Sequence, residues 1–470
     1  MWWLTAALAA TYDLAPGDDL TSFDLVAGDQ VLLAPGEYPQ TEAMSWTVDG
    51  TDGAPVVIQA EGGEARIVLQ ELAGFDADGA AGALNITGTW ARLEGISLSV
   101  PSGYEGFHGL VLDDVDHITI SDVAVSGADG ALLRIKGDSS SVHVEYAHLY
   151  DGVDGIRAGC SDASCWTQDS TFTQNWIHDV DDGIELFHGA NGNEVTHNVV
   201  HAVAEDGIYV GSTDYATENT VEGNVVWGAD EHGLRVQGAA LVRNNVVFNL
   251  AGIGLRADDP NRSAFESVVL SHNTIANSGD WAVQLQDWEG GIGLVLANNA
   301  LCNPDGYGLQ YVGDTEGDTG DTGASAGVDP GNRMIGNVVC GLVDGPETAA
   351  GHYVTGGGFG DFVDPESWDF YPSDGSALVN AADPDGDSWI PEVDFNGAPR
   401  EGDAPDVGAY EWDGSGNPGW AFREGFKEVE HERELEEEIV GGGCCGADGQ
   451  AAWLAVPLLG FGVRRRRRSR

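Results

Sequence analysis

Carboxylate side chains recur at one position of a short repeated phrase. Asp154, Asp182 and Asp206 each stand directly before a glycine and an aliphatic residue, and His232 has the same place in the next copy. If the copies stack, these carboxylates repel one another unless they share a proton, remain solvated or bind a cation. With Glu185 close by, the column is a candidate metal or acid–base site. Aspartate before glycine is also ordinary in tight turns, so a purely structural role stays open.

A second column lies two residues after the glycine of this phrase, which is Ala282 in one copy. Alternation along a strand sends the first residue after the glycine inward and the next one outward. The inward residues are Ile156, Ile184, Ile208, Leu234, Leu255, Val283 and Leu309. The outward residues are Arg157, Glu185, Tyr209, Arg235, Arg256, Gln284 and Gln310. Long polar side chains on a rigid sheet are expected of a sugar-binding groove, although any solvated sheet face has the same composition.

A repeated asparagine phrase supplies a third column, and each of its first six copies is followed eight or nine residues later by the glycine phrase. The asparagines are Asn175, Asn198, Asn224, Asn245, Asn273, Asn299 and Asn337. We expect them to form an internal hydrogen-bonded ladder without a catalytic role. Three residues after them stand His178, His201, Trp227, Phe248, Ala276, Cys302 and Cys340. The two aromatic rings could stack on sugars and the two histidines could share a metal, but aromatic residues stacked beneath a loop give the same pattern.

The candidate site residues follow from these columns. The catalytic candidates are Glu185, Arg157, Arg235 and, at the rim of the acidic column, His188. The substrate-binding candidates are Tyr209, Arg256 and Trp227. The metal candidates are Asp154, Asp182 and Asp206, and, in a separate C-terminal segment, Asp383, Asp385 and Asp387.

Successive asparagine phrases are separated by a variable number of residues, whereas the offset from each to the following glycine phrase is nearly fixed. This pattern predicts stacked coils whose strands are aligned and whose loops differ in length. The chain has 470 residues, of which 42% are hydrophobic, and 68 are glycines lying among short apolar runs. No long stretch has helical periodicity, so we predict an all-β protein. The formal net charge of −57 repels nucleic acid and polyanionic glycans and attracts cations.

The first coils carry a family resemblance. Residues 28–38 (GDQVLLAPGEY) and 50–60 (GTDGAPVVIQA) resemble the opening of the right-handed parallel β-helix superfamily that includes chondroitinase-B-like and alginate-lyase-like polysaccharide lyases. The resemblance implies a right-handed parallel β-helix, which we place at residues 12–345. It also implies a uronate lyase with a lysine and an arginine on adjacent coils beside two glutamates, often with calcium.

The family's catalytic residues do not recur at the corresponding positions. The coil at 182–188 has no lysine, and the next coil, at 207–211, has no arginine. The triplet at 134–136 (RIK) resembles the polygalacturonase signature, but it precedes the Asp-Asp-Gly at 181–183 instead of following it. The resemblance therefore implies a sugar-related fold and assigns no catalytic residue.

The cysteines predict two disulfides. Cys302 and Cys340 have the same offset in neighbouring coils, where strands lie about 4.8 Å apart, within reach of a disulfide. Cys160 and Cys165 close a short loop after a glycine phrase. Two bridges suit an exported protein.

The chain ends have compositions of their own. Residues 1–10 resemble a secretory signal, and a first strand preceded by an upstream start is the alternative. Residues 346–412 are expected to form closing coils and a cap over the open end of the solenoid. The alternating acids from Asp383 to Asp387 resemble a calcium loop, with Asp394 at the twelfth position, but Ser388 stands where an EF-hand has glycine.

An acidic linker is expected at 413–440. Residues 441–470 combine a Gly/Cys motif, a short apolar run and an arginine cluster, in the order found in the sorting tails of myxobacterial surface proteins. A simple C-terminal anchor is the alternative.

Two functions fit the sequence. The favoured one is a non-catalytic, cell-surface or secreted rod that binds a polysaccharide or cell-surface glycan. The alternative is a polysaccharide-degrading enzyme, either a uronate lyase or a glycoside hydrolase. In either case the chain is expected to be a monomer that does not bind nucleic acid, that touches a membrane only through its tail and whose one expected cofactor is calcium.

Overall fold

The computed structural model describes residues 9–70, 82–160, 165–211, 217–258, 266–286, 288, 292–312, 332–344, 353–384, 389–400 and 404–419. These residues all belong to the first of two units, Met1–Glu424, and the second unit is Gly425–Arg470. Most of the expected signal, most of the acidic linker, the sorting tail, Asp385 and Asp387 lie outside the described residues.

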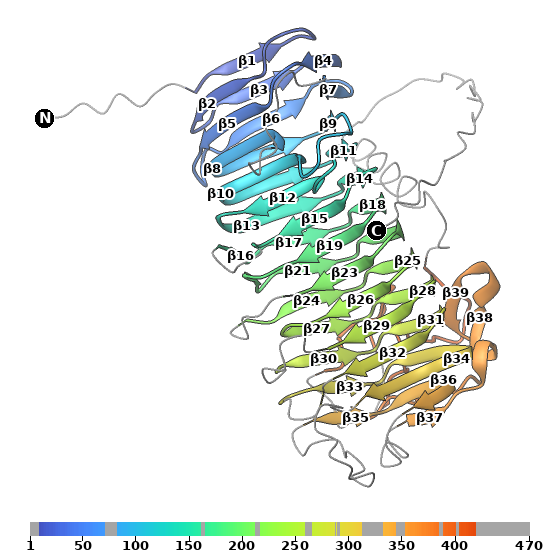
Figure 1. The fold of residues 1–470 in the computed structure, drawn as a ribbon. Coiled ribbons are helices and arrows are strands. Elements are labelled where there is room, and N and C mark those ends of the chain that lie inside the picture. The colour runs from blue at the N-terminus through green and yellow to red at the C-terminus, as the bar shows by residue number, and fades with distance from the viewer. Residues whose placement is uncertain are drawn as a thin grey trace, which may run out of the picture. The chain divides into compact units, whose positions relative to one another are not determined.

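The described chain is a parallel β-solenoid, which confirms the predicted all-β architecture. Each coil contributes strands to three parallel faces, which we call sheets A, B and C in their order along the chain. The strands of one sheet pair in parallel from coil to coil (Figure 1). The described residues contain no α-helix, and none of their helical turns has the length or hydrophobicity of a membrane span.

Sheet A contains β2 (Ser22–Val26), β5 (Met44–Asp49), the first parts of β8 (Gly82–Glu94) and β10 (His108–Ser121), β12 (Leu133–Lys136), β15 (Asp154–Ala158), β19 (Asp182–Leu186), β23 (Asp206–Val210), β26 (His232–Val236), β29 (Ile253–Ala257), β32 (Trp281–Gln286) and the ends of β34 (Ala300–Val312) and β36 (Asn337–Asp344).

Sheet B contains β1 (Thr11–Leu14), β3 (Gln30–Leu33), β6 (Val56–Ala60), the second parts of β8 and β10, β13 (Asp138–Glu145), β16 (Trp166–Gln168), β17 (Thr171–Thr173), β20 (Ala190–Asn191), β21 (Glu194–Thr196), β24 (Asn219–Glu222), β27 (Ala240–Arg243), β30 (Val268–Ser271), β33 (Val295–Ala297) and β35 (Arg333–Ile335).

Sheet C contains β4 (Gly36–Gln40), β7 (Ala65–Leu69), β9 (Ile96–Ser99), β11 (Ala124–Ser126), β14 (His148–Tyr150), β18 (Trp176–Val180), β22 (Val199–Val203), β25 (Val225–Ala229), β28 (Val246–Leu250), β31 (Thr274–Ser278), the first parts of β34 and β36, and β37 (Tyr353–Thr355).

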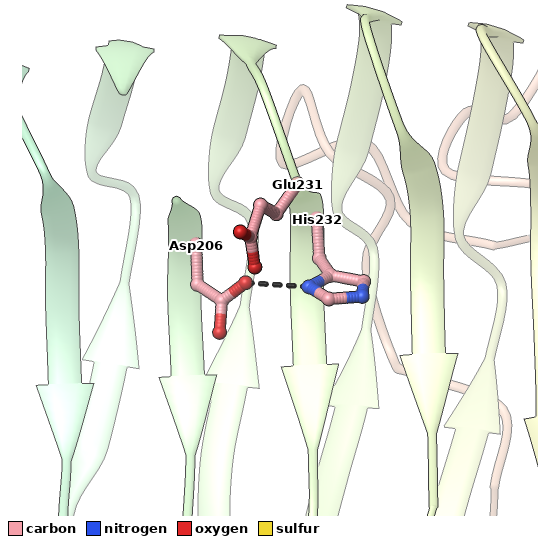
Figure 2. Close-up of side chains that lie close together, drawn as sticks. All are labelled: Asp206, Glu231 and His232. Atoms are coloured by element: carbon pink, nitrogen blue, oxygen red, sulfur yellow. Dashed lines mark hydrogen bonds and ion pairs between the residues drawn. The ribbon is translucent and has the colours of Figure 1, made fainter. Parts of the chain in front are cut away.

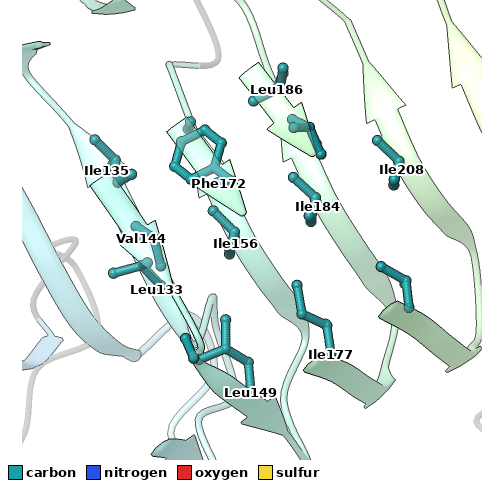
Figure 3. Close-up of a cluster of buried hydrophobic side chains, with 14 of the residues drawn as sticks. Leu133, Ile135, Val144, Leu149, Ile156, Phe172, Ile177, Ile184, Leu186 and Ile208 are labelled. Atoms are coloured by element: carbon teal, nitrogen blue, oxygen red, sulfur yellow. The ribbon is translucent and has the colours of Figure 1, made fainter. Parts of the chain in front are cut away.

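The core consists of aliphatic columns stacked from coil to coil. Ile156, Ile184 and Ile208 pair directly in successive strands of sheet A and are buried, as the sequence predicted for the inward column (Figure 3). Phe172 from sheet B and Ile177 from sheet C meet them in the interior. Burial of each such side chain contributes about 1.5–3 kcal/mol, so the repeated pattern stabilises every coil interface.

Glycine recurs before the inward column because successive coils approach closely there. A Cβ atom on Gly183 would overlap the carbonyl oxygen of Gly207 and a methyl group of Val200. The same holds for Gly207 against the carbonyl of Gly233 and a methyl of Val226. Only glycine fits where the backbones of neighbouring coils are this close.

The asparagines form the predicted internal ladder. Asn198 is fully buried, and its Nδ2 donates to Oδ1 of Asn224 at 3.0 Å, whose Nδ2 donates in turn to Oδ1 of Asn245 at 3.0 Å. The residue before each rung has a positive φ, for example 55° at His197 and 54° at Asn244. The ladder therefore supplies hydrogen bonds to backbone groups at the left-handed turn between sheets B and C.

The closing segment follows the solenoid with two 3₁₀ turns, η2 (Gly358–Asp361) and η3 (Pro365–Ser367), and an antiparallel pair, β38 (Phe362–Asp364) and β39 (Asp369–Pro372). Arg400 donates to Oδ1 of Asn244, at 2.9 Å, and the backbone N–H of Ala409 donates to Oγ1 of Thr274, at 2.9 Å. These contacts lie along the side of the coils near the turn between sheets B and C, while β37 (Tyr353–Thr355) pairs with β36 of the last coil; the cap over the open end stays a prediction.

Both predicted disulfides are present. The Cα atoms lie 5.7 Å apart for Cys160–Cys165 and 4.6 Å apart for Cys302–Cys340. Disulfides persist in oxidising compartments, so the pair indicates an extracytoplasmic protein.

Candidate functional site

The outward column predicted from the glycine phrase lies in register on sheet A. Arg157 pairs with Glu185, Glu185 with Tyr209, Tyr209 with Arg235, and Arg235 with Arg256. Each step is one strand spacing, about 4.8 Å. We call these five residues, on β15, β19, β23, β26 and β29, the sheet A strip.

At one end of the strip a carboxyl group is buried beside a guanidinium. Nε of Arg157 lies 3.0 Å from Oε2 of Glu185, and its Nη1 lies 3.4 Å from Oδ2 of Asp154. Burial raises the pKa of Glu185 to about 7, although Arg157 acts in the opposite direction. Burial also raises the pKa of Asp154. Glu185 is therefore close to half-protonated at neutral pH and can exchange a proton.

A second proton-holding carboxyl lies at the start of β19. Burial, with a smaller contribution from the neighbouring carboxylates, raises the pKa of Asp182 to about 8. Its Oδ1 accepts the backbone N–H of Asp206 at 3.0 Å. The predicted aspartate column is thus real, and proton uptake is one way in which it relieves charge repulsion.

The next carboxylate, Asp206, is held by two partners. Its Oδ1 lies 2.6 Å from Nδ1 of His232 and its Oδ2 lies 3.3 Å from Nη1 of Arg235. The carboxylate of Glu231 points toward the same place (Figure 2). Ligand atoms of Asp206, Glu231 and His232 all lie within 4.8 Å of one another, so this group could hold a metal ion.

The donor set of this group suits a transition metal better than calcium. Calcium takes six to eight oxygen ligands, whereas an imidazole with two carboxylates matches zinc or its neighbours. Of the three aspartates predicted as metal ligands on sheet A, only Asp206 belongs to the group. Asp154 faces Arg157, and Asp182 accepts a backbone N–H. Among the described residues, sequence reasoning missed Glu231 because it stands in the turn before the column.

The other end of the strip is a hydrogen-bonded network. The hydroxyl of Tyr209 donates to Oε1 of Gln237 at 2.7 Å, and Nε2 of Gln237 donates to both oxygens of Asp258 at 3.1 Å. Arg256 reaches Asp258 at 3.2 Å. Burial raises the pKa of Tyr209 to about 12, so the phenol keeps its proton at neutral pH. Gln237 and Asp258 stand two residues after strip members, and the same alternation could have revealed them.

Two candidates do not join the strip. The described ring contact of His188 is with Phe187, at 4.6 Å between centroids. Trp227 lies on sheet C and is 6% exposed, with His201 stacked on one side at 4.4 Å and Phe248 on the other at 5.8 Å. Trp368 of the closing segment contacts it at 5.6 Å. The alternative of aromatic residues stacked beneath a covering segment is therefore the observed arrangement.

Two further features lie beside the closing segment. Asp383, a predicted metal candidate, lies beside the turn that carries Asn298, and its backbone N–H donates to Oδ1 of that residue at 2.8 Å. A pocket of about 290 Å³ lies near Trp368, away from the strip. Its lining residues are Asn249, Asn277, Phe359, Pro365, Glu366, Trp368 and Phe370.

Comparison with known proteins identifies the type of fold. The model of a family described as right handed beta helix region matches residues 102–226, which confirms the predicted right-handed β-helix. A search of curated proteins found no match. Pectate lyase Pel9A is similar in structure, with a TM-score of 0.46 and 16% identity over 87% of this chain and 97% of that one.

Two mannuronan C-5 epimerase A-modules from Azotobacter vinelandii are also similar. AlgE6 has a TM-score of 0.48 and 14% identity over 67% of this chain and 87% of its own. AlgE4 has a TM-score of 0.47 and 14% identity over 70% of this chain and 91% of its own. At these identities the likeness concerns the fold alone.

Proposed function

We propose that this protein binds an extended glycan along the outer face of sheet A. The observation that carries the proposal is the sheet A strip, in which Arg157, Glu185, Tyr209, Arg235 and Arg256 stand in register on five successive coils. A row of hydrogen-bonding side chains on a rigid sheet suits a ligand that itself extends in one direction.

The arginines of the strip are fixed before a ligand arrives. The side chains of Arg157, Arg235 and Arg256 are 31%, 30% and 25% exposed, and each is paired with a carboxylate. Because they are already ordered, binding loses little side-chain entropy. Their remaining N–H groups can donate to hydroxyl or carboxylate oxygens of a sugar.

The charge of the protein narrows the class of glycan. The formal net charge of −57 repels a highly charged polyanion at long range. The three guanidinium groups of the strip are paired with Glu185 and with the adjacent carboxylates of Asp154, Asp206 and Asp258. A neutral or weakly acidic polysaccharide therefore fits better than a densely sulfated or fully uronic one.

A matched pair of arginine variants tests the proposal. Arg256 and Arg243 are both 25% exposed and both paired with a carboxylate, but Arg243 lies on sheet B, away from the strip. The protein is tested against a panel of neutral glycans and polyuronates. Arg256→Ala should weaken binding about 10- to 100-fold, the equivalent of one charged hydrogen bond, and Arg243→Ala should not. Equal loss in both variants, or no binding to any glycan, contradicts the proposal.

Catalysis on the bound glycan is the second candidate function, and one observation favours it. Burial holds the pKa of Glu185 at about 7 and that of Asp182 at about 8, so both can donate a proton near neutral pH. Such a carboxyl can protonate the leaving oxygen of a glycosidic bond. The basic residue that a uronate lyase would use is absent from the family's positions, which favours hydrolysis over elimination.

Product assays separate the two functions. Reducing ends that appear with the wild-type protein and disappear in Glu185→Gln indicate hydrolysis, whereas absorbance from an unsaturated product indicates a lyase. Binding of a glycan without formation of either product supports the non-catalytic function.

We also propose that the protein is exported and displayed at the cell surface. The two disulfides support export, and the order of Gly/Cys motif, apolar run and arginine cluster at 441–470 supports processing of the tail. Mass spectrometry of the protein recovered from cells tests this, because a full-length C-terminus on the mature protein contradicts processing.

A further inference from the structure

A group of histidines lies on the outer face of sheet C, away from the sheet A strip. Nε2 of His148, on β14, lies 2.8 Å from Nε2 of His178, on β18. Nδ1 of His178 lies 2.8 Å from Oδ2 of the neighbouring Asp179. The two Nε2 atoms, from adjacent coils, are thus within hydrogen-bond distance of each other, one ring donating and the other accepting, and a carboxylate contacts the second nitrogen of His178.

Stacking holds these rings in position. His148 stacks on Trp176 at 4.2 Å between centroids, with the two planes 5° apart. His178 lies between Tyr150, at 5.5 Å, and His201, at 5.0 Å. Since neighbouring rings cover the faces, the nitrogen-bearing edges are what the histidines offer to a ligand. A cation can approach these edges.

His201 is not part of the converging pair. Its Nε2 accepts a hydrogen bond from Nε1 of Trp176 at 3.0 Å, and it is only 6% exposed. The sequence offset suggested that His178 and His201 could share a metal. The structure instead stacks those two rings face to face, 5.0 Å apart, and turns His178 toward His148.

We propose that His148 and His178 bind a divalent transition metal through their Nε2 atoms, with Asp179 orienting His178. Neutral imidazole nitrogens are preferred ligands of zinc, copper and nickel. A carboxylate on the second ring nitrogen of a ligating histidine fixes its tautomer and raises its basicity. Solvent completes the coordination sphere, because His178 remains 14% exposed.

A metal bound by the pair replaces the hydrogen bond between the two Nε2 atoms, and both rings must turn toward the ion. Two nitrogens bound to one zinc ion at about 2.0–2.1 Å in tetrahedral geometry are about 3.4 Å apart, so the rings must separate by about 0.6 Å. The net charge of −57 raises the local concentration of cations.

The site is distinct from the group formed by Asp206, Glu231 and His232 on sheet A. That group has a single nitrogen ligand and an arginine beside it. The sheet C pair has two nitrogen ligands, and its nearest described charge is the carboxylate of Asp179. A metal bound by the pair therefore has a different spectroscopic signature.

The test uses Cu²⁺ and Zn²⁺ as probes on the full-length protein. Cu²⁺ binding is followed by electron paramagnetic resonance, which counts nitrogen ligands, and Zn²⁺ binding by calorimetry. His148→Gln and His178→Gln should each lose one equivalent of metal and the two-nitrogen signal. His143→Gln is the matched control, because its ring on sheet B also contacts a carboxylate, Glu145, at 3.1 Å.

Asp179→Asn separates ligation from folding. Asp179 is 55% exposed and has a φ of 53°, which asparagine tolerates, so the variant should keep the fold. We expect metal affinity to fall about 10- to 100-fold while the two-nitrogen signal persists. The proposal is overturned if both histidine variants keep the full equivalent, or if Asp179→Asn leaves the affinity unchanged.

Discussion

The asparagine ladder makes the sharpest prediction about stability. Nδ2 of Asn245 donates to the carbonyl of Val221 and to Oδ1 of Asn273, both at 2.9 Å, and the side chain is fully buried. Its Oδ1 accepts from the backbone N–H and the Nδ2 of Asn224, both at 3.0 Å. Asn245→Asp keeps the shape and the acceptor but replaces both donated hydrogen bonds with contacts between oxygens.

The expected loss of stability follows from the two acceptors, the carbonyl of Val221 and Oδ1 of Asn273, that lose their donor. Each unsatisfied buried acceptor costs about 1–3 kcal/mol, so Asn245→Asp should destabilise the protein by about 4 kcal/mol at pH 7. Burial raises the pKa of the new carboxyl above its unfolded value. Its contribution is therefore most favourable below the unfolded pKa and is lost as pH rises, so the variant should be less destabilised at pH 5 than at pH 8.

Amide hydrogen exchange is the assay of choice, because solenoids can open coil by coil and a single unfolding midpoint averages over them. A loss of about 4 kcal/mol corresponds to about 1,000-fold faster exchange in β25 and β28. Asn277→Asp is the control, since Asn277 is exposed and its described side-chain hydrogen bond is to Asn249. Equal acceleration in both variants, or no acceleration in Asn245→Asp, would refute the role of the ladder.

Two further predictions concern stability. Because the pKa of Glu185 rises from 4.5 to about 7 on folding, its contribution to stability is full below about pH 4.5 and falls by about 3 kcal/mol as the pH rises through 7. Urea unfolding at pH 5 and pH 8 should show this loss in the wild type and a smaller one in Glu185→Gln; identical pH dependence would contradict the assignment. Replacing Cys302 and Cys340 with serine opens a loop of 38 residues and should cost about 4 kcal/mol, against about 2 kcal/mol for Cys160 and Cys165, separated by 5. A larger loss from the short loop would contradict the loop-length argument.

The sequence predicted those features that follow from the repeat. Once the asparagines fixed the frame, a constant offset placed Ile184 inside, Glu185 outside and Cys302 above Cys340, because parallel strands in a solenoid stack residue on residue. These predictions needed no knowledge of loops. The structure confirms that Ile184 is buried and that Cys302 pairs with Cys340, and it places Glu185 in the outward column, where neighbouring side chains leave only 7% of it exposed.

The repeat could not predict contacts between residues at different offsets of adjacent coils, or contacts with segments outside the repeat. The approach of His148 to His178 depends on how stacked rings tilt between adjacent coils. The covering of Trp227 by Trp368 depends on where the closing segment returns. Sequence offset specifies neither, because both are set by side-chain packing between elements that are not equivalent in the repeat.

The position of a bound glycan tests the central claim most directly. The best ligand from the panel is shortened to an oligosaccharide and its complex with the protein is crystallised. We predict density along the outer face of sheet A, in contact with Arg157, Tyr209 and Arg256. Density in the pocket near Trp368, or over sheet C, with the sheet A strip left bare, would contradict the account.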